Sequence, residues 1–355
     1  MAGAYLQRIA TAVPEHDVHE KFVAYAGGML KDPRAQTIFK RLASKSGIEH
    51  RYSCLLEDPP GEGGGSDAFS FYGNGRFPST AERMKVFEQS APVLARKALD
   101  RLALTAEERS RIRHVLVTCC TGFYAPGLDF EIVDYLGLPD STERGFMGCY
   151  AAMNALKLAR HIVRSDPGAL VLAVNLELCS LHFQPSQQVA EVIAFTLFGD
   201  GCAASLIGNE PTGLEMESFN ALRIEGTRDL ITWRVGDLGF DMFLSTHVPA
   251  AIVRGMRQYA GSGAEDGMGL MDGVQLWAVH PGGRSILDAV EEGLALPPCA
   301  LQASRSVLAS FGNMSSASVM FVLERLMKCA RPGEEGCAIS FGPGMTAEMM
   351  RFHAV

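Results

Sequence analysis

Three residues of types that act together in acyl transfer stand in separate parts of this chain. Cys149 lies in Gly148-Cys-Tyr-Ala-Ala152, directly before a predicted helix. Unpaired backbone N–H groups and the positive end of the helix dipole at such a position favour the thiolate form of a cysteine. His280 ends an apolar segment just before Pro281-Gly-Gly283, and Asn313 stands in a loop of small residues that opens another predicted helix. A thiolate, an imidazole and an amide N–H donor suit acyl transfer or Claisen condensation, in which an oxyanion must be stabilised.

Taken singly, each of these residues has a simpler interpretation. A cysteine is most often a small buried hydrophobe, a histidine at a strand end usually satisfies a turn, and an asparagine before a helix is commonly an N-cap. The prediction therefore depends on all three meeting at one place in the fold.

The segments that would position them alternate between short apolar runs and amphipathic stretches. The apolar runs predict buried strands, at 114–120, 169–174, 275–280, 336–340 and 349–355. The amphipathic stretches predict helices, at 150–164, 286–292 and 317–328. The helix over 150–164 has a single narrow polar stripe, which is typical of a helix buried between sheets. The pattern predicts an α/β protein with two halves, residues 1–208 and 209–355.

Composition excludes several classes of protein. The chain of 355 residues has 32 basic and 40 acidic side chains, a net charge of −8, which disfavours a nucleic-acid binder. Neither a membrane span nor a signal peptide is evident, so we expect a cytoplasmic protein. The nine cysteines are too dilute for a disulfide scaffold and lack the spacing of a zinc site, and no cofactor ligand set is apparent. The Gly- and Pro-rich stretch 58–80 predicts a surface loop.

Five stretches together resemble the chalcone-synthase-like family, the type III polyketide synthases, in its bacterial form. They follow one another in the family's order, at 148–160, 194–204, 277–288, 311–323 and 340–348, and include the runs H-P-G-G and G-N-M-S-S-A. The resemblance covers nearly the whole chain. It implies a thiolase-like fold, with two related α/β halves in a layered αβαβα arrangement, and a homodimer that uses acyl-CoA and malonyl-CoA and needs no further cofactor.

The resemblance also implies a role for each matching residue. Cys149 would be the nucleophile that carries the acyl chain, while His280 and Asn313 would drive decarboxylation of malonyl-CoA and stabilise the enolate. Phe198 and Phe243 match the two aromatic gatekeepers of the reaction cavity. Further cavity residues would be Glu177, Cys120, Thr121, Ala125, Cys179, His182 and Ser315, and Lys45 and Arg41 match basic residues that contact the CoA phosphates.

The expected activity is the loading of an acyl-CoA starter on Cys149, its extension with malonyl-CoA and cyclisation to an alkylpyrone or alkylresorcinol. The small Ala125, where plant enzymes carry a methionine, favours an aliphatic or fatty acyl starter. The stretch around Cys179 and His182 also resembles malonyl-primed tetrahydroxynaphthalene synthases, so two starter classes stay open.

Other classes predict different behaviour. A ketoacyl synthase III would use an acyl carrier protein and lacks the H-P-G-G run, and a hydroxymethylglutaryl-CoA synthase needs a glutamate base beside its cysteine. A cysteine hydrolase would release free acid without forming a carbon–carbon bond. A catalytically silent scaffold would leave Cys149 unacylated.

Overall fold

The computed structural model describes residues 3–55, 70–72, 77–139, 141–147, 151–261, 271 and 273–355. The predicted nucleophile Cys149 lies outside the described residues, and so does most of the stretch 58–80.

Strands and helices are interspersed along the described chain. The strands are β1 (Tyr5–Ala12), β2 (His16–Asp17), β3 (Tyr52–Ser53), β4 (Ile112–Thr118), β5 (Glu143–Met147), β6 (Leu170–Leu178), β7 (Asp200–Gly208), β8 (Leu214–Arg223), β9 (Ile231–Gly236), β10 (Gly239–Leu244), β11 (Leu276–Val279), β12 (Glu335–Gly342) and β13 (Thr346–Ala354). The α-helices are α1 (His19–Met29), α2 (Pro33–Ala43), α3 (Thr80–Leu102), α4 (Ala106–Arg111), α5 (Leu128–Leu136), α6 (Ala151–Ser165), α7 (Val189–Phe195), α8 (Val248–Gly261), α10 (Arg284–Gly293), α11 (Gln302–Phe311) and α12 (Ser318–Met327). Short 3-10 helices lie at Ser70–Tyr72, Cys179–His182 and Ser315–Ala317.

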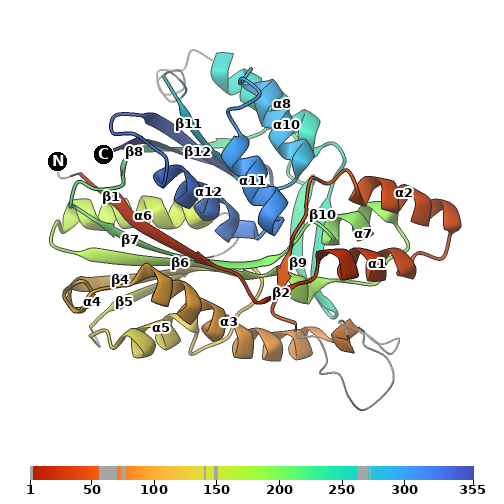
Figure 1. The fold of residues 1–355 in the computed structure, drawn as a ribbon, viewed down its shortest axis with the longest axis horizontal. Coiled ribbons are helices and arrows are strands. Elements are labelled where there is room, and N and C mark those ends of the chain that lie inside the picture. The colour runs from red at the N-terminus through yellow and green to blue at the C-terminus, as the bar shows by residue number, and fades with distance from the viewer. Residues whose placement is uncertain are drawn as a thin grey trace.

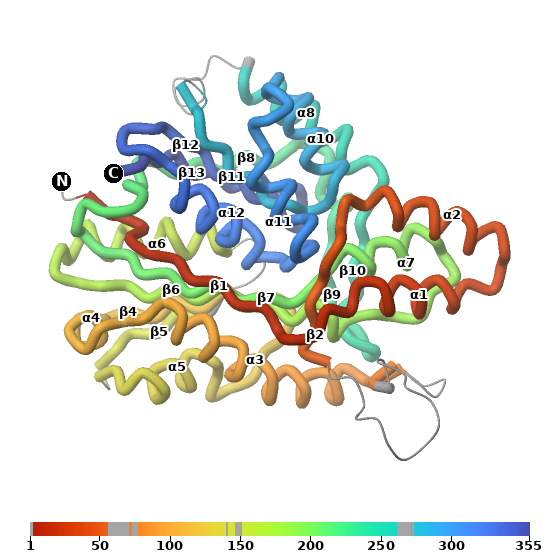
Figure 2. The backbone as a smooth tube through the Cα atoms, in the orientation of Figure 1, coloured from red at the N-terminus to blue at the C-terminus, as the bar shows by residue number. Residues whose placement is uncertain are grey.

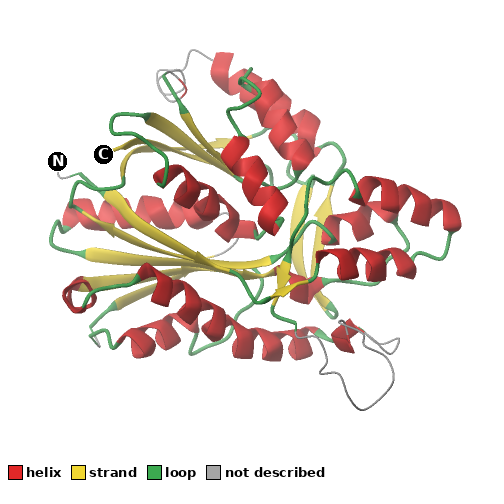
Figure 3. Cartoon of the chain, in the orientation of Figure 1, coloured by secondary structure: helices red, strands yellow, loops and turns green. Residues whose placement is uncertain are grey.

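A nine-stranded sheet runs through the molecule in the order β11-β12-β13-β8-β1-β7-β6-β4-β5 (Figure 1). Strands β1 and β4 to β7 come from the N-terminal part of the chain, and β8 and β11 to β13 from the C-terminal part. The two sets join where β1 pairs with β8, at Tyr5 opposite Glu215 and Leu6 opposite Leu214. This short junction lets the two sets of strands diverge on either side of a central layer of helices (Figure 3).

The central layer consists of α6 and α12. Helix α6 packs on β4, β6 and β7 and also on β13, while α12 packs on β1, β7, β11 and β12. Their apolar side chains form one buried cluster with residues from both sets of strands. Because this layer is covered on both sides, nearly all of α12 is buried, including Val319, Phe321 and Leu323. The narrow polar stripe predicted for 150–164 is explained by this position.

Two outer layers complete the arrangement. Helices α3 and α5 cover the other face of the N-terminal strands, and α8 and α10 pack with the C-terminal strands in a separate core cluster. Figure 2 shows the N-terminal outer helices in orange and yellow and the C-terminal ones in cyan and blue, on opposite sides of the molecule. The predicted layered αβαβα arrangement is confirmed.

The predicted elements agree with the observed ones to within a few residues. The run 114–120 became β4, 169–174 became part of the longer β6, and 286–292 lies within α10. Helix α3 shows the local reason for such boundaries, since Ser79 and Glu82 form a reciprocal capping box at its start.

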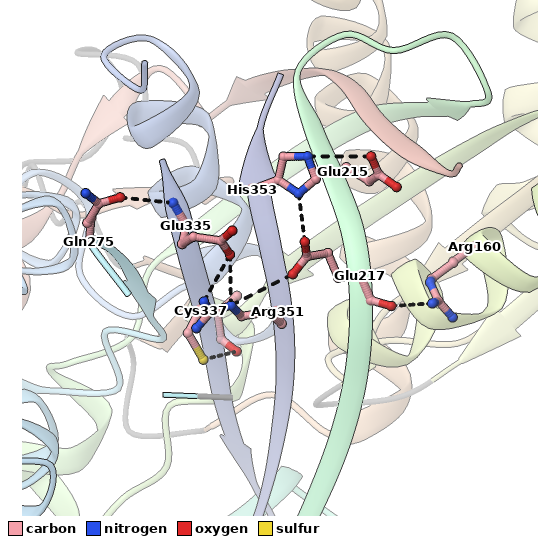
Figure 4. A network of polar contacts seen from close by, with 9 residues as sticks. Arg160, Glu215, Glu217, Gln275, Glu335, Cys337, Arg351 and His353 are labelled. Atoms are coloured by element: carbon pink, nitrogen blue, oxygen red, sulfur yellow. Dashed lines mark hydrogen bonds and ion pairs between the residues drawn. The ribbon is translucent and has the colours of Figure 1, made fainter. Parts of the chain in front are cut away.

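Polar side chains tie the C-terminal strands together (Figure 4). Arg351 of β13 pairs with Glu335 of β12 at 3.0 Å, and His353 of β13 contacts Glu217 of β8 at 2.8 Å. On the other side of β8, Arg160 of α6 donates hydrogen bonds to the backbone carbonyls of Met216 and Glu217. The central helix is thereby attached to the strands of the C-terminal half.

The closest packing in these strands predicts a stability effect. A Cβ at Gly336 would lie 2.2 Å from the ring of the fully buried Phe352. We expect Gly336→Ala to lower the free energy of unfolding by about 1–3 kcal/mol, because the core is overpacked, as measured by denaturant unfolding.

The matched control is Gly28→Ala in α1, where an added Cβ meets nothing within 4 Å. This substitution should leave stability unchanged or raise it by up to about 1 kcal/mol. Equal effects of the two substitutions would contradict the packing argument.

Candidate functional site

A pocket lies between elements of both halves and holds seven of the predicted site residues. Its walls enclose roughly 920 Å³ of space, part of it open to solvent. The predicted residues that line it are Cys120, Thr121, Cys179, Phe198, His280, Asn313 and Ser315. Most of the remaining wall is apolar, from β9, β10, α8 and α10, and includes Ile231, Trp233, Met242, Leu244, Val248, Ile252 and Ile286.

The backbone and the side chain of Asn313 are both fixed by hydrogen bonds to neighbouring segments. Its backbone N–H donates to Leu197 O at 2.8 Å, and its own carbonyl accepts from Gly199 N at 3.0 Å. The side-chain Oδ1 accepts from Ser315 N at 2.9 Å, and Nδ2 donates to Gly282 O at 3.2 Å. The amide orientation follows from these partners, because the oxygen is engaged by a backbone donor. One N–H of the amide stays available to a carbonyl oxygen in the pocket.

His280 follows β11, and its backbone N–H donates to Ile339 O at 2.8 Å. Burial lowers the pKa of His280 to about 4, since the charged imidazolium loses its hydration in the apolar pocket. The ring is therefore neutral at pH 7 and presents one N–H donor and one acceptor. The carbonyl of Gly282, which accepts from Asn313 Nδ2, lies two residues further on, so this hydrogen bond ties the Asn313 amide to the segment that carries His280.

Glu177 lies behind the pocket wall and is fully buried. Its carboxylate accepts hydrogen bonds from Cys120 N at 3.0 Å, Thr121 Oγ1 at 2.8 Å and Ser316 Oγ at 2.5 Å. Burial raises the pKa of Glu177, and these hydrogen bonds oppose the increase. The glutamate thus joins the loop after β4 to the 3-10 helix Ser315–Ala317 from the opposite half.

Two thiols and a hydroxyl of the predicted cavity set lie on the pocket wall. Cys120 Sγ is 3.2 Å from Ser315 Oγ, and Cys179 begins the 3-10 helix that follows β6. Ser315 adopts a left-handed conformation with φ of 47°, which turns the chain sharply after Asn313.

Four predicted cavity residues do not line the pocket: Glu177, His182, Phe243 and Ala125. Phe243 points away from the pocket and is 52% exposed, whereas its neighbours Met242 and Leu244 line it. The reason is strand alternation in β10, where successive side chains face opposite sides. His182 is buried behind the wall: Nε2 donates to Thr121 O at 2.6 Å and Nδ1 accepts from Phe240 N at 3.1 Å. Both ring nitrogens are occupied by the backbone, so His182 supports the wall and does not line the cavity.

Trp233 was missed by the sequence analysis. It lines the pocket from β9 and donates from Nε1 to Cys120 O at 3.0 Å. The ring of Phe240, which stacks on His182, contacts the indole edge to face. The alternation of inward and outward side chains along 239–244 could have identified Met242 as a pocket residue. A single tryptophan in a short strand does not show from the sequence which face of the strand it occupies.

The remaining predicted residues lie on the surface. Arg41 at the end of α2 and Lys45 just after it are exposed, and Ala125 is exposed in the loop before α5. None of the three lines the pocket. Their predicted roles in CoA binding and cavity shape stay predictions.

No cluster of metal-ligating side chains occurs within the part of the chain that the structure describes. Among the same residues, no helix is long and apolar enough to cross a membrane.

Comparison with known proteins gives matches over the whole chain. Residues 2–211 match the family model of chalcone and stilbene synthases, N-terminal domain, and residues 216–355 match that of the C-terminal domain. Curated relatives from Mycobacterium tuberculosis and Mycobacterium bovis, named alpha-pyrone synthesis polyketide synthase-like Pks18, are 34% identical over 99% of this chain and 91% of their own length. These matches confirm the resemblance seen in the motifs.

Solved structures agree in fold. The structure of PKS-I from the brown alga Ectocarpus siliculosus is 28% identical and covers 100% of this chain and 99% of its own, with a TM-score of 0.87. The C-terminal type III polyketide synthase domain of Steely1 from Dictyostelium is 23% identical, covers 99% of each chain and has the same TM-score of 0.87, which supports the fold alone.

The hydrogen bonds of His182 predict a pH-dependent stability. Burial lowers its pKa to about 4 in the folded state, against an ordinary value of 6.5. The unfolded chain binds more protons between these values, so stability falls as the pH drops from about 6.5 towards 4. We expect His182→Gln to lose about 1–3 kcal/mol at pH 7, because the single amide of glutamine does not replace both ring nitrogens, which bond to Thr121 O and Phe240 N from two sides. The variant should also show a shallower loss of stability on acidification.

Thermal unfolding between pH 4.5 and 7.5 measures both effects. The exposed His161 provides the matched control, as His161→Gln removes a histidine outside the buried network. A pH dependence for His182→Gln as steep as that of the wild type would contradict the assignment of His182 as a buried neutral ring.

Proposed function

Because this chain belongs to the chalcone and stilbene synthase family, the type III polyketide synthases, we propose that its pocket extends an aliphatic acyl starter with malonyl-CoA and releases an alkylpyrone. Members of the family are acyltransferases that perform decarboxylating condensations on CoA thioesters and need no other cofactor. The observation that carries the proposal is that His280 and Asn313 both line one largely apolar pocket, with Asn313 bonded to Gly282 two residues after His280.

The reaction begins with transfer of the starter acyl group from CoA to the thiolate of Cys149. Malonyl-CoA then enters with its thioester carbonyl directed at His280 and Asn313. When the bond to the carboxylate breaks and CO2 leaves, its electron pair forms an enolate, whose oxygen accepts hydrogen bonds from the imidazole N–H and the amide N–H. The enolate carbon attacks the acyl group on Cys149, and the thiolate is released as the leaving group.

The protonation state of His280 suits these two tasks. The neutral imidazole that burial favours can take the proton of Cys149, and the resulting ion pair raises the pKa of the imidazole again, since an opposite charge favours its protonated form. The available N–H of Asn313 is aimed without rearrangement, because its other polar atoms are already bonded. Donors arranged in advance in a low-dielectric site stabilise an oxyanion most effectively.

An aliphatic starter is supported by the composition of the pocket wall. Side chains of β9, β10, α8 and α10 present alkyl and thioether groups, among them Ile231, Met242, Leu244 and Ile252. Burial of each methylene of an alkyl chain against such a wall contributes about 0.8 kcal/mol. The relatives named for alpha-pyrone synthesis, at 34% identity, support a pyrone as the product.

A malonyl-primed synthase of the tetrahydroxynaphthalene type is the second candidate. Polar wall atoms of Cys120, Thr121 and Ser315 favour it, because a poly-β-keto chain carries carbonyl groups at every second carbon. The two candidates differ in whether malonyl-CoA alone is sufficient. A ketoacyl synthase III-like activity, which would need a carrier protein, is the weaker alternative.

The proposal includes the oligomer and the CoA contacts. We propose that the CoA phosphates lie near Arg41, at the end of α2, and Lys45, just after that helix, because both side chains are exposed and cationic. The exposed loop around Phe123 and Ala125 is the surface that we assign to a homodimer contact.

The first test is incubation of the purified protein with labelled malonyl-CoA and starters from acetyl-CoA to long-chain acyl-CoA. We expect pyrones from aliphatic starters, identified by mass spectrometry, and no product with Cys149→Ala. Loss of one oxyanion donor in Asn313→Ala should reduce kcat about 100- to 1,000-fold.

Product from malonyl-CoA alone would replace the leading proposal with the malonyl-primed alternative. Release of free acid without a new carbon–carbon bond would contradict both.

A second test compares two neighbouring residues of β10. Met242→Ala should shift the ratio of kcat/KM for long against short starters by at least about 10-fold, because it removes bulk from the pocket wall. Phe243→Ala, on the outer face, is the matched control and should leave that ratio unchanged. A larger effect at Phe243 would restore it as the gatekeeper and contradict the orientation of β10.

A further inference from the structure

Arg51 is a buried cation directly behind the wall that carries Phe198 and Asn313. It is only 1% exposed and precedes β3, where its backbone is held by a donation to Asp17 Oδ1 at 3.2 Å and by acceptance from Val18 N at 2.8 Å. The guanidinium lies over the ring of Phe22, with 4.8 Å between Cζ and the ring centroid. Both ends of the residue are thus anchored in the N-terminal half.

One hydrogen bond of the Arg51 side chain reaches the 197–199 segment, which carries Phe198 into the pocket wall. Nη1 donates to Phe198 O at 2.5 Å, and Nε donates to His19 Nδ1 at 3.0 Å. Burial lowers the pKa of Arg51 to about 10, which leaves it protonated at pH 7. A charged donor makes the hydrogen bond to the Phe198 carbonyl stronger than a neutral donor would.

The segment that Arg51 holds is the one that positions Asn313. Phe198 pairs with Asn313 as neighbouring backbones, through the hydrogen bonds from Asn313 N to Leu197 O and from Gly199 N to Asn313 O. Gly312 lies against the stem of the arginine, since a Cβ there would be 2.8 Å from Arg51 Cγ and 2.8 Å from Leu197 O. Arg51 therefore contacts both backbone segments whose pairing sets the direction of the Asn313 amide.

Packing alone does not account for an arginine at this place. A hydrophobic side chain of similar size would fill the space without the desolvation of a buried charge. What the guanidinium adds is a pair of directed hydrogen bonds, one to Phe198 O and one to His19 Nδ1.

We propose that Arg51 is a positioning residue of the condensation reaction, which holds the 197–199 segment so that the Asn313 amide and the Phe198 ring face the substrate. The inference rests on the proposed function of the pocket and goes beyond it by assigning a residue outside the pocket to the same step. It acts on the decarboxylation that Asn313 serves and not on the loading of Cys149.

The test measures the two half-reactions separately in Arg51→Lys. A misplacement of about 1 Å at a reacting group costs about 100-fold in rate. We expect kcat for malonyl-CoA decarboxylation to fall by about 10- to 100-fold, with KM changed less than about threefold. Acylation of Cys149 by the starter, followed by mass spectrometry of the intact protein, should continue at a rate near that of the wild type.

Arg83 provides the matched control for buried charge. It is fully buried in α3, donates to the carbonyls of Pro78, Leu181 and Phe183, and lies over the ring of Tyr72. Arg83→Lys should lower the Tm to a similar extent as Arg51→Lys but leave the ratio of decarboxylation to acylation unchanged.

A double-mutant cycle with Asn313→Ala identifies the route of the effect. If Arg51 acts through Asn313, Arg51→Lys should reduce decarboxylation much less in the Asn313→Ala background than in the wild type. Additive effects would overturn the proposal, as would a parallel loss in Arg83→Lys or an unchanged kcat in Arg51→Lys.

His19 gives a second route in case the Arg51 variants do not fold. His19→Ala removes the partner of Arg51 Nε and should lower decarboxylation about 3- to 10-fold, whereas His19→Gln, with an amide oxygen as acceptor, should restore most of it. Equal rates for the two variants would contradict the inference. A wild-type protein that neither acylates Cys149 nor decarboxylates malonyl-CoA would instead contradict the proposed function.

Discussion

The pairing of two short backbone segments, 197–199 and 312–313, is the contact on which the pocket depends. The first segment leads into β7 of the N-terminal strands, and the second directly follows α11 in the C-terminal half. Their hydrogen bonds, at 2.8 and 3.0 Å, join the halves where Phe198 and Asn313 enter the pocket. Glycines on both segments permit the approach, since a Cβ at Gly199 would lie 2.8 Å from Phe311 O.

The layered arrangement of strands and helices explains why the pairing of 197–199 with 312–313 lies beside a pocket. Helices α6 and α12 fill the space between the two sets of strands, and the strand sets diverge from the brief β1–β8 junction. Much of the apolar wall of the pocket is formed by side chains of β9, β10, α8 and α10. They are bulky and apolar, so they lower the polarity of the space they surround, which favours electrostatic stabilisation of an enolate.

Two buried carboxylates near the pocket, those of Asp200 and Glu177, accept hydrogen bonds from backbone N–H groups. Asp200 accepts from Cys54 N at 2.7 Å and from Ser180 N at 2.8 Å, and Glu177 accepts from Cys120 N. Each of these contacts fixes a loop to a distant strand, because a buried carboxylate without partners would be strongly destabilising. The walls of the pocket are consequently held by polar contacts as well as by packing.

The sequence was sufficient to predict the layered α/β fold, the positions of five strands and three helices, and the inclusion of His280 and Asn313 in a common site. Those predictions depend on local patterns, such as the narrow polar stripe of α6, and on motifs that stand at the ends of elements. A residue at the end of a buried strand or at the start of a helix is placed by its own segment, whatever surrounds it. The roles of Cys149, Arg41 and Lys45 rest on motif resemblance.

Only the tertiary structure decided which side chains line the pocket. Met242 lines it and Phe243 does not, because the pairing of β9 with β10 sets which face of a short strand points inward. His182 supports the wall from behind, since its ring nitrogens meet Thr121 and Phe240 from two other segments. The role of Arg51 depends on a carbonyl 147 residues away. Such contacts join segments that are remote along the chain, and no local pattern records the partner.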